Sequence, residues 1–308
     1  MLAILLSAYN GEQFIADQLD SLLQQTYQDF HIYACDDCST DSTYAIIQDY
    51  CARYPGRIAA TRSAQNSGGA KHNAIRLMIE HREDYLMLCD QDDVWLPNKI
   101  EITLAKLKEM ENRYGIDVPL MVHTDLEVVD AQLETIQPSF WAAMNSNCYK
   151  NKLHNLVIQN IITGCTVMYN RALAELIWAE PRFMVMHDWW LGLAAAAFGY
   201  IEPMEIQTIK YRQHANNDIG AKDVRTMSYK FKRLLNYGEV KHAVNMTYRQ
   251  AESFLEMYRE RLTAEQIRLL VEYSAMPNHN KVKKWITICR LGTFKNGVGR
   301  KIAQFLFI

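Results

Sequence analysis

The feature that most constrains the fold is the stretch Tyr85–Lys99, in which an apolar run stops abruptly at a group of acids. The apolar part is typical of a strand buried in a sheet. Asp90, Asp92 and Asp93 follow it, and Pro97 stands where a helix can begin, since proline is tolerated in a first helical turn. We therefore expect the acids in a turn at the carboxyl end of a strand, where open α/β sheets bind ligands.

These three carboxylates fall within four positions and repel each other. A divalent cation relieves such repulsion, and oxygen ligands suit Mg²⁺ or Mn²⁺, particularly where a diphosphate supplies the remaining oxygens. The alternative is a solvated acidic turn without a ligand. This stretch alone does not decide between the two.

Apolar strands alternate with amphipathic helices on both sides of the acids. Before them we expect strands at 2–6, 30–35 and 57–61, each followed by a turn and a helix. After them we expect a helix at 97–115, strands at 120–122, 161–168 and 206–211, and helices at about 171–178 and 187–198. This rhythm predicts an α/β fold with a mainly parallel sheet flanked by helices.

Composition is that of a globular protein, with 49% hydrophobic and 22% charged residues among 308. Seven cysteines, an odd number, follow no recognisable signal peptide, so we expect a cytoplasmic protein with most of its cysteines in the core. Cys35 and Cys38 have the spacing of a redox motif, but the two aspartates between them have a better explanation below.

Charge is distributed unevenly along the chain. Residues 222–308 hold 17 Lys+Arg and 7 Asp+Glu, whereas the first 221 residues hold 16 and 28. Residues 224–275 have a helical, amphipathic pattern, with a capping box at 263–266. We expect one domain over 1–220 and a basic, helical C-terminal region over 221–308.

The last segment, 281–308, contains seven Lys+Arg and no acid, interleaved with aromatic and aliphatic residues. A basic amphipathic segment can lie on an anionic membrane surface. The alternative is a helix packed on the body with its basic face in water. We favour the membrane, and therefore expect peripheral binding to the inner face of the cell membrane.

Four stretches together resemble the family-2 glycosyltransferases, which have the type-A nucleotide-sugar transferase fold. In the family's order they are Ser7–Gly11, Asp36–Thr43, Asp90–Lys99 and His187–Trp189. One motif alone would be weak, but four in order, covering about residues 1–215, are specific. A less specific match, to bacterial rhamnosyltransferases, rests on Asp90–Pro97, His123–Leu126 and Tyr211–Asn217.

The resemblance implies a metal-dependent, inverting sugar transfer with Mn²⁺ or Mg²⁺ as cofactor. The rhamnosyltransferase subgroup commonly uses dTDP-L-rhamnose and builds cell-wall or capsular polysaccharide. We therefore expect dTDP-L-rhamnose as donor and a lipid-linked oligosaccharide as acceptor, with UDP-galactose or UDP-glucose as the alternative donor. We expect no nucleic-acid partner, and the oligomeric state stays open.

The resemblance assigns Ala8, Tyr9 and Asn10 to the segment that contacts the nucleotide. The alternatives are core packing for Tyr9 and a turn for Asn10. In the loop after the third strand, Lys71 could meet a phosphate or be merely exposed.

Asp37 matches the family's acceptor for the pyrimidine N3–H, a role that suits a carboxylate because it is a pure acceptor. Helix capping is the alternative for Asp36 and Asp37, although Ser39 or Asp41 could supply the cap instead. The family usually has glycine where this chain has Cys38, which would be strained if the position needs a positive φ.

Asp92 and Asp93 match the family's paired acids at the metal, with Asp93 the first choice for direct ligation. Asp90 could bind the ion through water or touch the ribose. His214 matches a position that can reach the metal or diphosphate, with a purely structural role as the alternative.

Asp188 matches the catalytic base, which takes a proton from the acceptor hydroxyl as that hydroxyl attacks C1. The alternative is stabilisation of helix 187–198 through its dipole. Thr163 and Gly164 match a turn on the acceptor side, and Trp189 is either a sugar-stacking surface or part of the core.

Two other classes compete with this interpretation. A sugar-nucleotide pyrophosphorylase needs a glycine-rich, arginine-containing N-terminal loop, and Ser7–Gly11 stands there instead. An inactive assembly partner needs neither Asp93 nor Asp188, and both are present.

Overall fold

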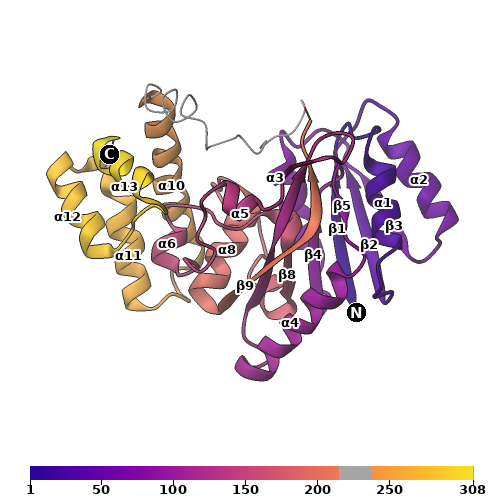
Figure 1. Ribbon diagram of the computed structural model, residues 1–308. Helices are drawn as coiled ribbons and strands as arrows, with labels where there is room; N and C mark the ends of the chain where they lie inside the picture. Colours follow the sequence, from indigo (N-terminus) through magenta and orange to yellow (C-terminus); the bar gives the residue numbers. More distant parts are fainter. Residues whose placement is uncertain (215–236, 308) are drawn as a thin grey trace. The chain divides into compact units, whose positions relative to one another are not determined.

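The structure, a computed structural model, describes residues 1–214 and 237–307, which fall into two compact units (Figure 1). The sheet unit contains Met1–Phe140, Ile162–Glu180 and the described residues from Gly199 to His214. The helical unit contains Trp141–Ile161, Pro181–Phe198 and the described residues from Tyr237 onward. The expected boundary near residue 220 lies outside the described residues, as does the expected helix over 224–236.

The sheet unit is built on a sheet of nine strands among the described residues, in the order β3-β2-β1-β4-β8-β6-β9-β5, with β7 paired to β6. The strands are β1 (Leu2–Ala8), β2 (Phe30–Asp36), β3 (Ile58–Arg62), β4 (Tyr85–Cys89), β5 (Val94–Trp95), β6 (Leu120–Val129), β7 (Thr135–Gln137), β8 (Val167–Asn170) and β9 (Tyr200–Arg212). Strands β3, β2, β1 and β4 pair in parallel. The predicted α/β fold is confirmed, and the rest of the sheet is mixed because β8 runs antiparallel to both β4 and β6.

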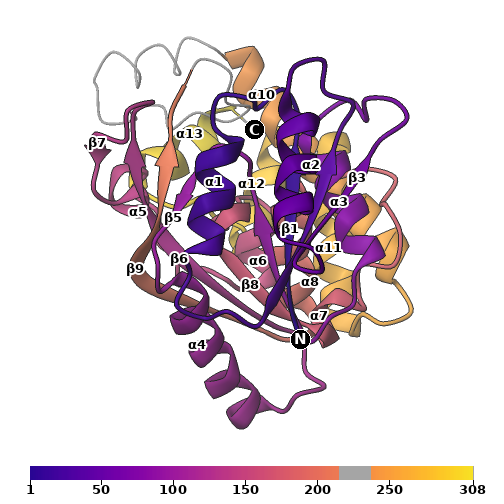
Figure 2. The same cartoon turned by 90° about the vertical axis from the view of Figure 1, so that its right-hand side faces the viewer.

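Helices pack on both faces of this sheet. They are α1 (Ile15–Leu23), α2 (Thr43–Arg53), α3 (Ala70–Glu80), α4 (Lys99–Tyr114) and α7 (Arg171–Ala174). Right-handed crossovers place α1 and α2 on one face, and the return from β3 to β4 places α3 on the other. The first face holds the main core, in which α1 packs against alternate β1 residues. Figure 2 looks onto α1 and α2 with the strands behind them.

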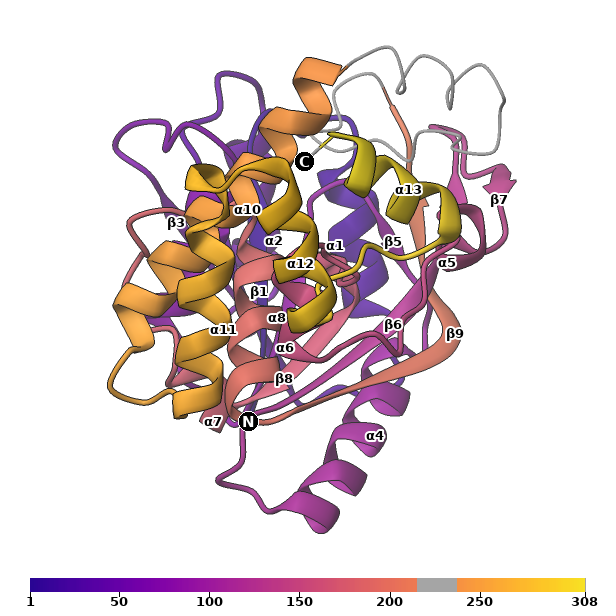
Figure 3. The same cartoon turned by 90° about the vertical axis from the view of Figure 1, so that its left-hand side faces the viewer.

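The helical unit contains α6 (Leu153–Leu156), α8 (His187–Phe198), α10 (Tyr237–Tyr258), α11 (Ala264–Ser274), α12 (Lys281–Leu291) and α13 (Val298–Phe307) (Figure 3). It also takes in most of α5 (Phe140–Ala143) and the 3-10 turn η2 (Met276–Asn278). Trp190 of α8 is fully buried, with its ring 5.2 Å from that of Phe254 in α10. The predicted capping box at Thr263 and Gln266 is present at the start of α11. Within the described residues, no helix combines the length and the apolarity needed to cross a bilayer.

The strand expected at 120–122 is longer than predicted. It continues as β6 to Val129, so His123, Thr124 and Asp125 lie inside the strand and are buried, not at its end. Pairing with β9 gives two of them partners: the Thr124 hydroxyl lies 2.6 Å from that of Thr208, and Nε2 of Gln207 donates to Asp125 Oδ2 at 3.1 Å. Polar residues can therefore continue a strand when the neighbouring strand supplies their partners.

Three further expectations need correction. Pro97 precedes the N-cap residue Asn98, and the helix begins at Lys99, because β5 has formed just before it. The strand expected at 161–168 begins only at Val167, because Gly164 opens the 3-10 turn η1 (Gly164–Thr166). The strand expected at 206–211 starts at Tyr200, because β6 extends alongside it.

Candidate functional site

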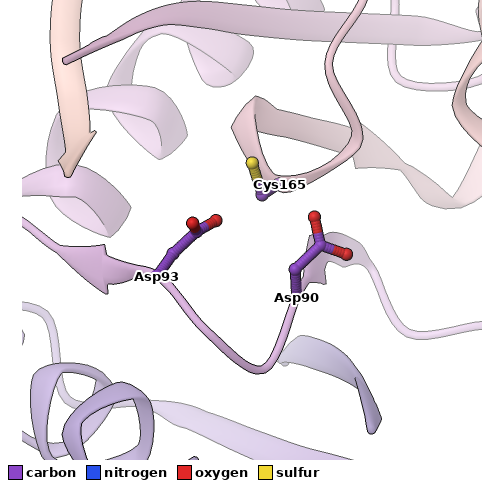
Figure 4. Close-up of side chains that lie close together, drawn as sticks. All are labelled: Asp90, Asp93 and Cys165. Carbon is purple, nitrogen blue, oxygen red and sulfur yellow. The ribbon is translucent and has the colours of Figure 1, made fainter. Parts of the chain in front are cut away.

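The acid loop, residues 90–93, joins β4 to β5 at the carboxyl end of β4, as predicted. Its Asp90 and Asp93 lie beside Cys165, which comes from η1 just before β8. One donor atom from each of these three side chains lies within 4.8 Å of the others, and Figure 4 shows the three side chains close together. Because β8 pairs with β4, the turn that precedes β8 is held next to the acid loop.

Asp93 is fully buried and only half satisfied. Its Oδ1 accepts the backbone N–H of Arg212 at 3.2 Å, whereas its Oδ2 meets no N–H or O–H donor among the described residues. Burial raises the pKa of the Asp93 carboxyl, and the charges of Asp92 and Asp90 raise it further. The ammonium of fully buried Lys99 interacts with Asp93 and Cys165, and a divalent ion would offset the remaining repulsion among the acids, so this group of side chains fits such an ion.

Neighbouring groups experience the same negative field. Burial raises the pKa of the Cys165 thiol well above its usual range, and the charges of Asp93 and Asp90 add to the effect. Burial and the same acids also raise the pKa of the Tyr211 hydroxyl. The field therefore belongs to the site as a whole and does not arise from one residue.

Asp92 has a different environment from its neighbours. Its Oδ2 lies 2.9 Å from Nε2 of His214, which follows the end of β9. The His214 ring also lies 4.6 Å from the ring of Phe14. The structure thus brings together two of the three predicted metal residues, Asp92 and His214, and places the third, Asp93, with Asp90. Residues 215–217 of the motif that ends β9 lie outside the described residues.

Arg212 holds the acid loop in place through hydrogen bonds. The sequence analysis assigned no role to this residue. Its side chain is buried, donates through Nε to the Asp92 carbonyl at 3.0 Å, and reaches Asp17 Oδ2 at 2.9 Å. Its guanidinium also lies 4.7 Å from the centre of the Phe14 ring. The only sequence signal was its place in the motif that ends β9.

Asp37 lies at the end of β2 and is buried. Its carboxylate accepts from the hydroxyl of Ser63 at 3.1 Å, and from the backbone N–H and hydroxyl of Ser67 at distances down to 2.7 Å. The Ser67 N–H is shared between the two oxygens, so these three donors make four contacts, two on each oxygen of the Asp37 carboxylate. The loop that contains Ser67 also leads into α3, where Lys71 is the second residue and half-buried.

Asp36 and Asp37, the acid pair at the end of β2, do not cap the following helix. The N-cap residue of α2 is Ser42, and the Thr43 N–H donates to Asp41 at 3.0 Å. Asp36 instead accepts from the Ser39 N–H at 3.1 Å and pairs with Arg62 at 3.2 Å. These contacts hold the turn at Cys38, whose φ of 64° is the positive value at which a cysteine is strained.

Ala8 is buried at the end of β1, and Tyr9 after it is 45% exposed, so core packing does not explain Tyr9. Tyr9 and Gln91 of the acid loop exchange two hydrogen bonds of 2.8 Å, from Tyr9 N–H to Oε1 and from Nε2 to the Tyr9 carbonyl. Asn10 has a φ of 48° and accepts the Thr40 N–H at 2.8 Å, so it forms the turn that was its alternative. These contacts tie the ends of β1, β2 and β4 together.

In the helical unit, Asp188 is the second residue of α8 and is largely buried. Its Oδ1 accepts the N–H of Trp189 at 2.6 Å and lies 3.3 Å from the amide nitrogen of Asn160. Trp189 is also buried, and its indole N–H donates to the Leu156 carbonyl at 2.6 Å, which is the core setting left open for it. In the sheet unit, Thr163 is the N-cap residue of η1 and Gly164 is buried.

A family model described as Glycosyl transferase family 2 matches residues 3–177, which is more than half of the chain. The chain belongs to this family. That membership confirms the resemblance and removes the pyrophosphorylase alternative.

Relatives within the family differ in the sugar that their names give. The dTDP-rhamnosyl transferase RfbG of Shigella flexneri is 31% identical over 237 residues, which are 74% of this chain and 78% of that protein. The Escherichia coli protein WfgD, named UDP-Glc:alpha-D-GlcNAc-diphosphoundecaprenol beta-1,3-glucosyltransferase, is 26% identical over 108 residues, or 35% and 41% of the two chains. The match to WfgD therefore spans less than half of either protein.

Among solved structures, this family-2 chain is similar to Staphylococcus aureus TarS 1–349 in complex with UDP. The TM-score is 0.55 at 16% identity, and the match covers 95% of this chain and 92% of that one. The likeness shows a type-A glycosyltransferase fold, as expected.

Proposed function

We propose that this family-2 glycosyltransferase transfers L-rhamnose from dTDP-L-rhamnose to a lipid-linked oligosaccharide, with inversion at C1. The assignment of dTDP-L-rhamnose as the donor rests on the 31% identity to RfbG over 74% of the chain. The arrangement of Asp37 at the end of β2 and the acid loop at the end of β4 supports a nucleoside diphosphate sugar of this kind.

Asp37 is the proposed contact of the base. The carboxylate is held by Ser63 and Ser67, and the pyrimidine N3–H would take the place of one of these donors, for example where the Ser67 N–H is shared between both oxygens. Thymine and uracil both present this donor, so Asp37 selects a pyrimidine but does not separate dTDP from UDP. Exposed Tyr9, Asn10 beside it and Lys71 at the start of α3 are the proposed further contacts of the nucleotide.

Asp93 and Asp90 are the proposed residues that hold Mn²⁺ or Mg²⁺, with Asp92 and His214 as a neighbouring pair. The bound ion would supply Lewis-acid neutralisation of the departing diphosphate. Arg212 would keep the loop in place through its bonds to Asp93 and to the Asp92 carbonyl. Burial of Asp93 would keep bulk water away from the carboxylate and strengthen its attraction for a cation.

Asp188 is the proposed base. It would take the proton of the acceptor hydroxyl as that oxygen attacks C1 from the face opposite the leaving diphosphate, which inverts the anomeric centre. Asn160 and the Trp189 N–H contact its Oδ1 and would fix its orientation. Thr163, Gly164 and Trp189 stay predictions for the acceptor side.

The proposed division of the chain is a catalytic domain of 1–220 and a C-terminal region of 221–308. A lipid-linked acceptor calls for a route to the membrane surface, and we place this route on α12 and α13 of the C-terminal region. The helical spacing of Val282 and Ile286, and of Val298, Ile302 and Leu306, forms an apolar stripe on each helix, with these side chains 53% to 75% exposed. The Trp285 indole N–H donates to the Phe305 carbonyl at 2.9 Å, which ties the two helices together. Seven Lys+Arg and no acid in 281–308 complement anionic lipid headgroups.

The donor is tested by calorimetry and by nucleotide release in Mn²⁺, comparing dTDP-L-rhamnose with UDP-glucose and UDP-galactose. We expect dTDP-L-rhamnose to bind at least as tightly as either UDP-sugar and to be the one that turns over. Asp37→Asn should weaken all pyrimidine nucleotides together, whereas Asp117→Asn, an exposed control, should change none. Turnover of a UDP-hexose alone would replace the donor assignment, and failure to turn over any donor would favour an inactive assembly partner.

A further inference from the structure

We propose that the Cys165 thiolate is a third protein ligand of the divalent cation, beside Asp90 and Asp93, and that the site therefore prefers thiophilic ions to Mg²⁺. The inference rests on the metal dependence in the proposed function. It adds a third protein ligand of the ion and a preference for thiophilic ions over Mg²⁺. It also predicts which ions would occupy the site when several are present.

The geometry of the three donor atoms suits a single ion. Ligand oxygen and sulfur atoms lie about 2.0–2.3 Å from an ion such as Zn²⁺, so two of them on one ion are at most about 4.5 Å apart. The donor atoms of Asp90, Asp93 and Cys165 all lie within 4.8 Å of one another. Three atoms that all lie within 4.8 Å of one another are at most about 2.8 Å from a common point, so each would move by less than about 1 Å to reach one ion.

A second observation points to a ligand at this position. Oδ2 of Asp93 is fully buried and meets no N–H or O–H donor among the described residues. The hydrogen-bond partner that the Asp93 carboxylate has at this position is the Cys165 thiol, whose proton a cation would displace (Figure 4). An anionic oxygen in a buried setting costs free energy unless a cation or a strong donor meets it. The thiol sulfur of Cys165 is buried at the same point.

The backbone holds Cys165 in place. It is the middle residue of η1, where the Thr166 N–H donates to the Thr163 carbonyl at 2.9 Å and the Thr166 hydroxyl donates to the same carbonyl at 2.7 Å. The turn then leads directly into β8, which pairs with β4 on one side and β6 on the other. A ligand on such a braced turn is more precisely positioned than one on a free loop.

The two other polar neighbours have partners of their own. Cys89 at the end of β4 donates its thiol to the Asp90 carbonyl at 3.3 Å, and Asp92 pairs with His214. Of these thiols, Cys165 is therefore the one grouped with both carboxylates. A bound ion displaces the thiol proton, and thiolate ligands favour Cd²⁺, Co²⁺ and Zn²⁺ over Mg²⁺.

The test uses the full chain with dTDP and measures binding of Mg²⁺, Mn²⁺ and Cd²⁺ by calorimetry, and of Co²⁺ by its thiolate charge-transfer absorption. All proteins carry Cys289→Ser, because Cys289 is exposed and would bind thiophilic ions by itself. Cys165→Ser and Cys165→Ala are compared with Cys148→Ser, a matched control at a buried thiol that is not one of the grouped residues. Circular dichroism and thermal melting establish that each variant is folded.

We expect the Cys165 variants to lose at least about tenfold in Cd²⁺ affinity while Mg²⁺ affinity changes much less. The Co²⁺ charge-transfer band should appear in the parent and in Cys148→Ser, should vanish in the Cys165 variants, and should be erased by excess Mn²⁺. The inference is overturned if Mn²⁺ binds but the parent shows no such band, or if the ratio of Cd²⁺ to Mg²⁺ affinity survives in a folded Cys165 variant. If the Cys165 variants fail to fold, the Co²⁺ charge-transfer band of the parent and its loss in excess Mn²⁺ still test whether a thiolate binds the ion. Absence of binding by every ion would instead overturn the metal dependence itself, whatever donor the enzyme uses.

Discussion

Nε2 of His214 lies 2.9 Å from Oδ2 of Asp92, although 122 positions separate the two residues along the chain. Asp93, the next residue, instead lies with Asp90 and Cys165. The two aspartates lie in the loop before β5, and their side chains enter two different settings. The acid loop therefore divides its charge between the Asp92–His214 pair and a buried group that fits a cation.

The Asp92–His214 pair leads to the first prediction. His214→Asn removes the imidazole that meets Asp92, and loss of a partner that orients a ligand-bearing loop typically costs about 10–100-fold in metal affinity. We expect a loss of that order for Mn²⁺ in the presence of dTDP, measured by calorimetry. His242→Asn, at an exposed histidine, is the control and should change nothing. Unchanged affinity in a folded His214 variant would leave His214 with a structural role.

Asp93→Asn keeps the shape of the side chain but removes its charge. We expect Mn²⁺ affinity to fall at least about tenfold and turnover to fall with it, because a neutral amide is a poorer ligand for a hard cation. Thermal melting should show an intact fold, since the amide oxygen can still accept the Arg212 N–H. Near-normal turnover in Mn²⁺ would rule out Asp93 as a direct ligand.

Asp188→Asn tests the base. The amide cannot accept the proton of the acceptor hydroxyl, and general-base assistance is typically worth about 10²–10⁴ in rate. We expect kcat to fall by that order while donor and Mn²⁺ affinities stay close to those of the parent. Loss of donor binding with unaltered single-turnover chemistry would make Asp188 a donor-site residue, and Asp125 would be tested next.

Replacing Val298, Ile302 and Leu306 with Asn tests the membrane surface. These side chains are exposed, so the fold should tolerate the change, while binding to anionic vesicles at low salt should weaken strongly as apolar area is lost. Added salt should weaken binding of the parent further. Ile116→Asn, at an exposed apolar residue of the sheet unit, is the control. If the full-length parent ignores anionic vesicles at low salt, α12 and α13 are ordinary packed helices.

Two buried histidines predict how stability depends on pH. Burial lowers the pKa of His123 to about 3 and that of His187 to about 4, so both are neutral in the folded protein near pH 6. Below about pH 6.5 the unfolded chain binds protons that the folded chain does not, so the free energy of unfolding falls as pH decreases, by up to about 1.4 kcal/mol per pH unit for each histidine. Urea titrations between about pH 5 and 7 measure this slope.

The matched variants separate these histidines from other titrating groups. His123→Gln should reduce the slope, whereas His242→Gln, at an exposed position, should leave it almost unchanged. An identical slope in the parent and in His123→Gln would show that His123 does not remain neutral on folding.

The sequence by itself determined the order of the strands and helices up to β4 and the place of the acid loop. These are local properties, because an apolar run that ends in acids and a turn defines its own strand end. The start of α11 at the Thr263 capping box follows from equally local chemistry, whereas the positive φ at Cys38 was left open by the sequence.

Only the tertiary structure decided which distant residues meet the acids. Strand β8 inserts antiparallel between β4 and β6, and that insertion brings Cys165 to Asp90 and Asp93. The extended β9 likewise brings Arg212 and His214 to the acid loop. Strand order depends on how whole elements pack and pair, so no periodicity or spacing within one segment predicts it.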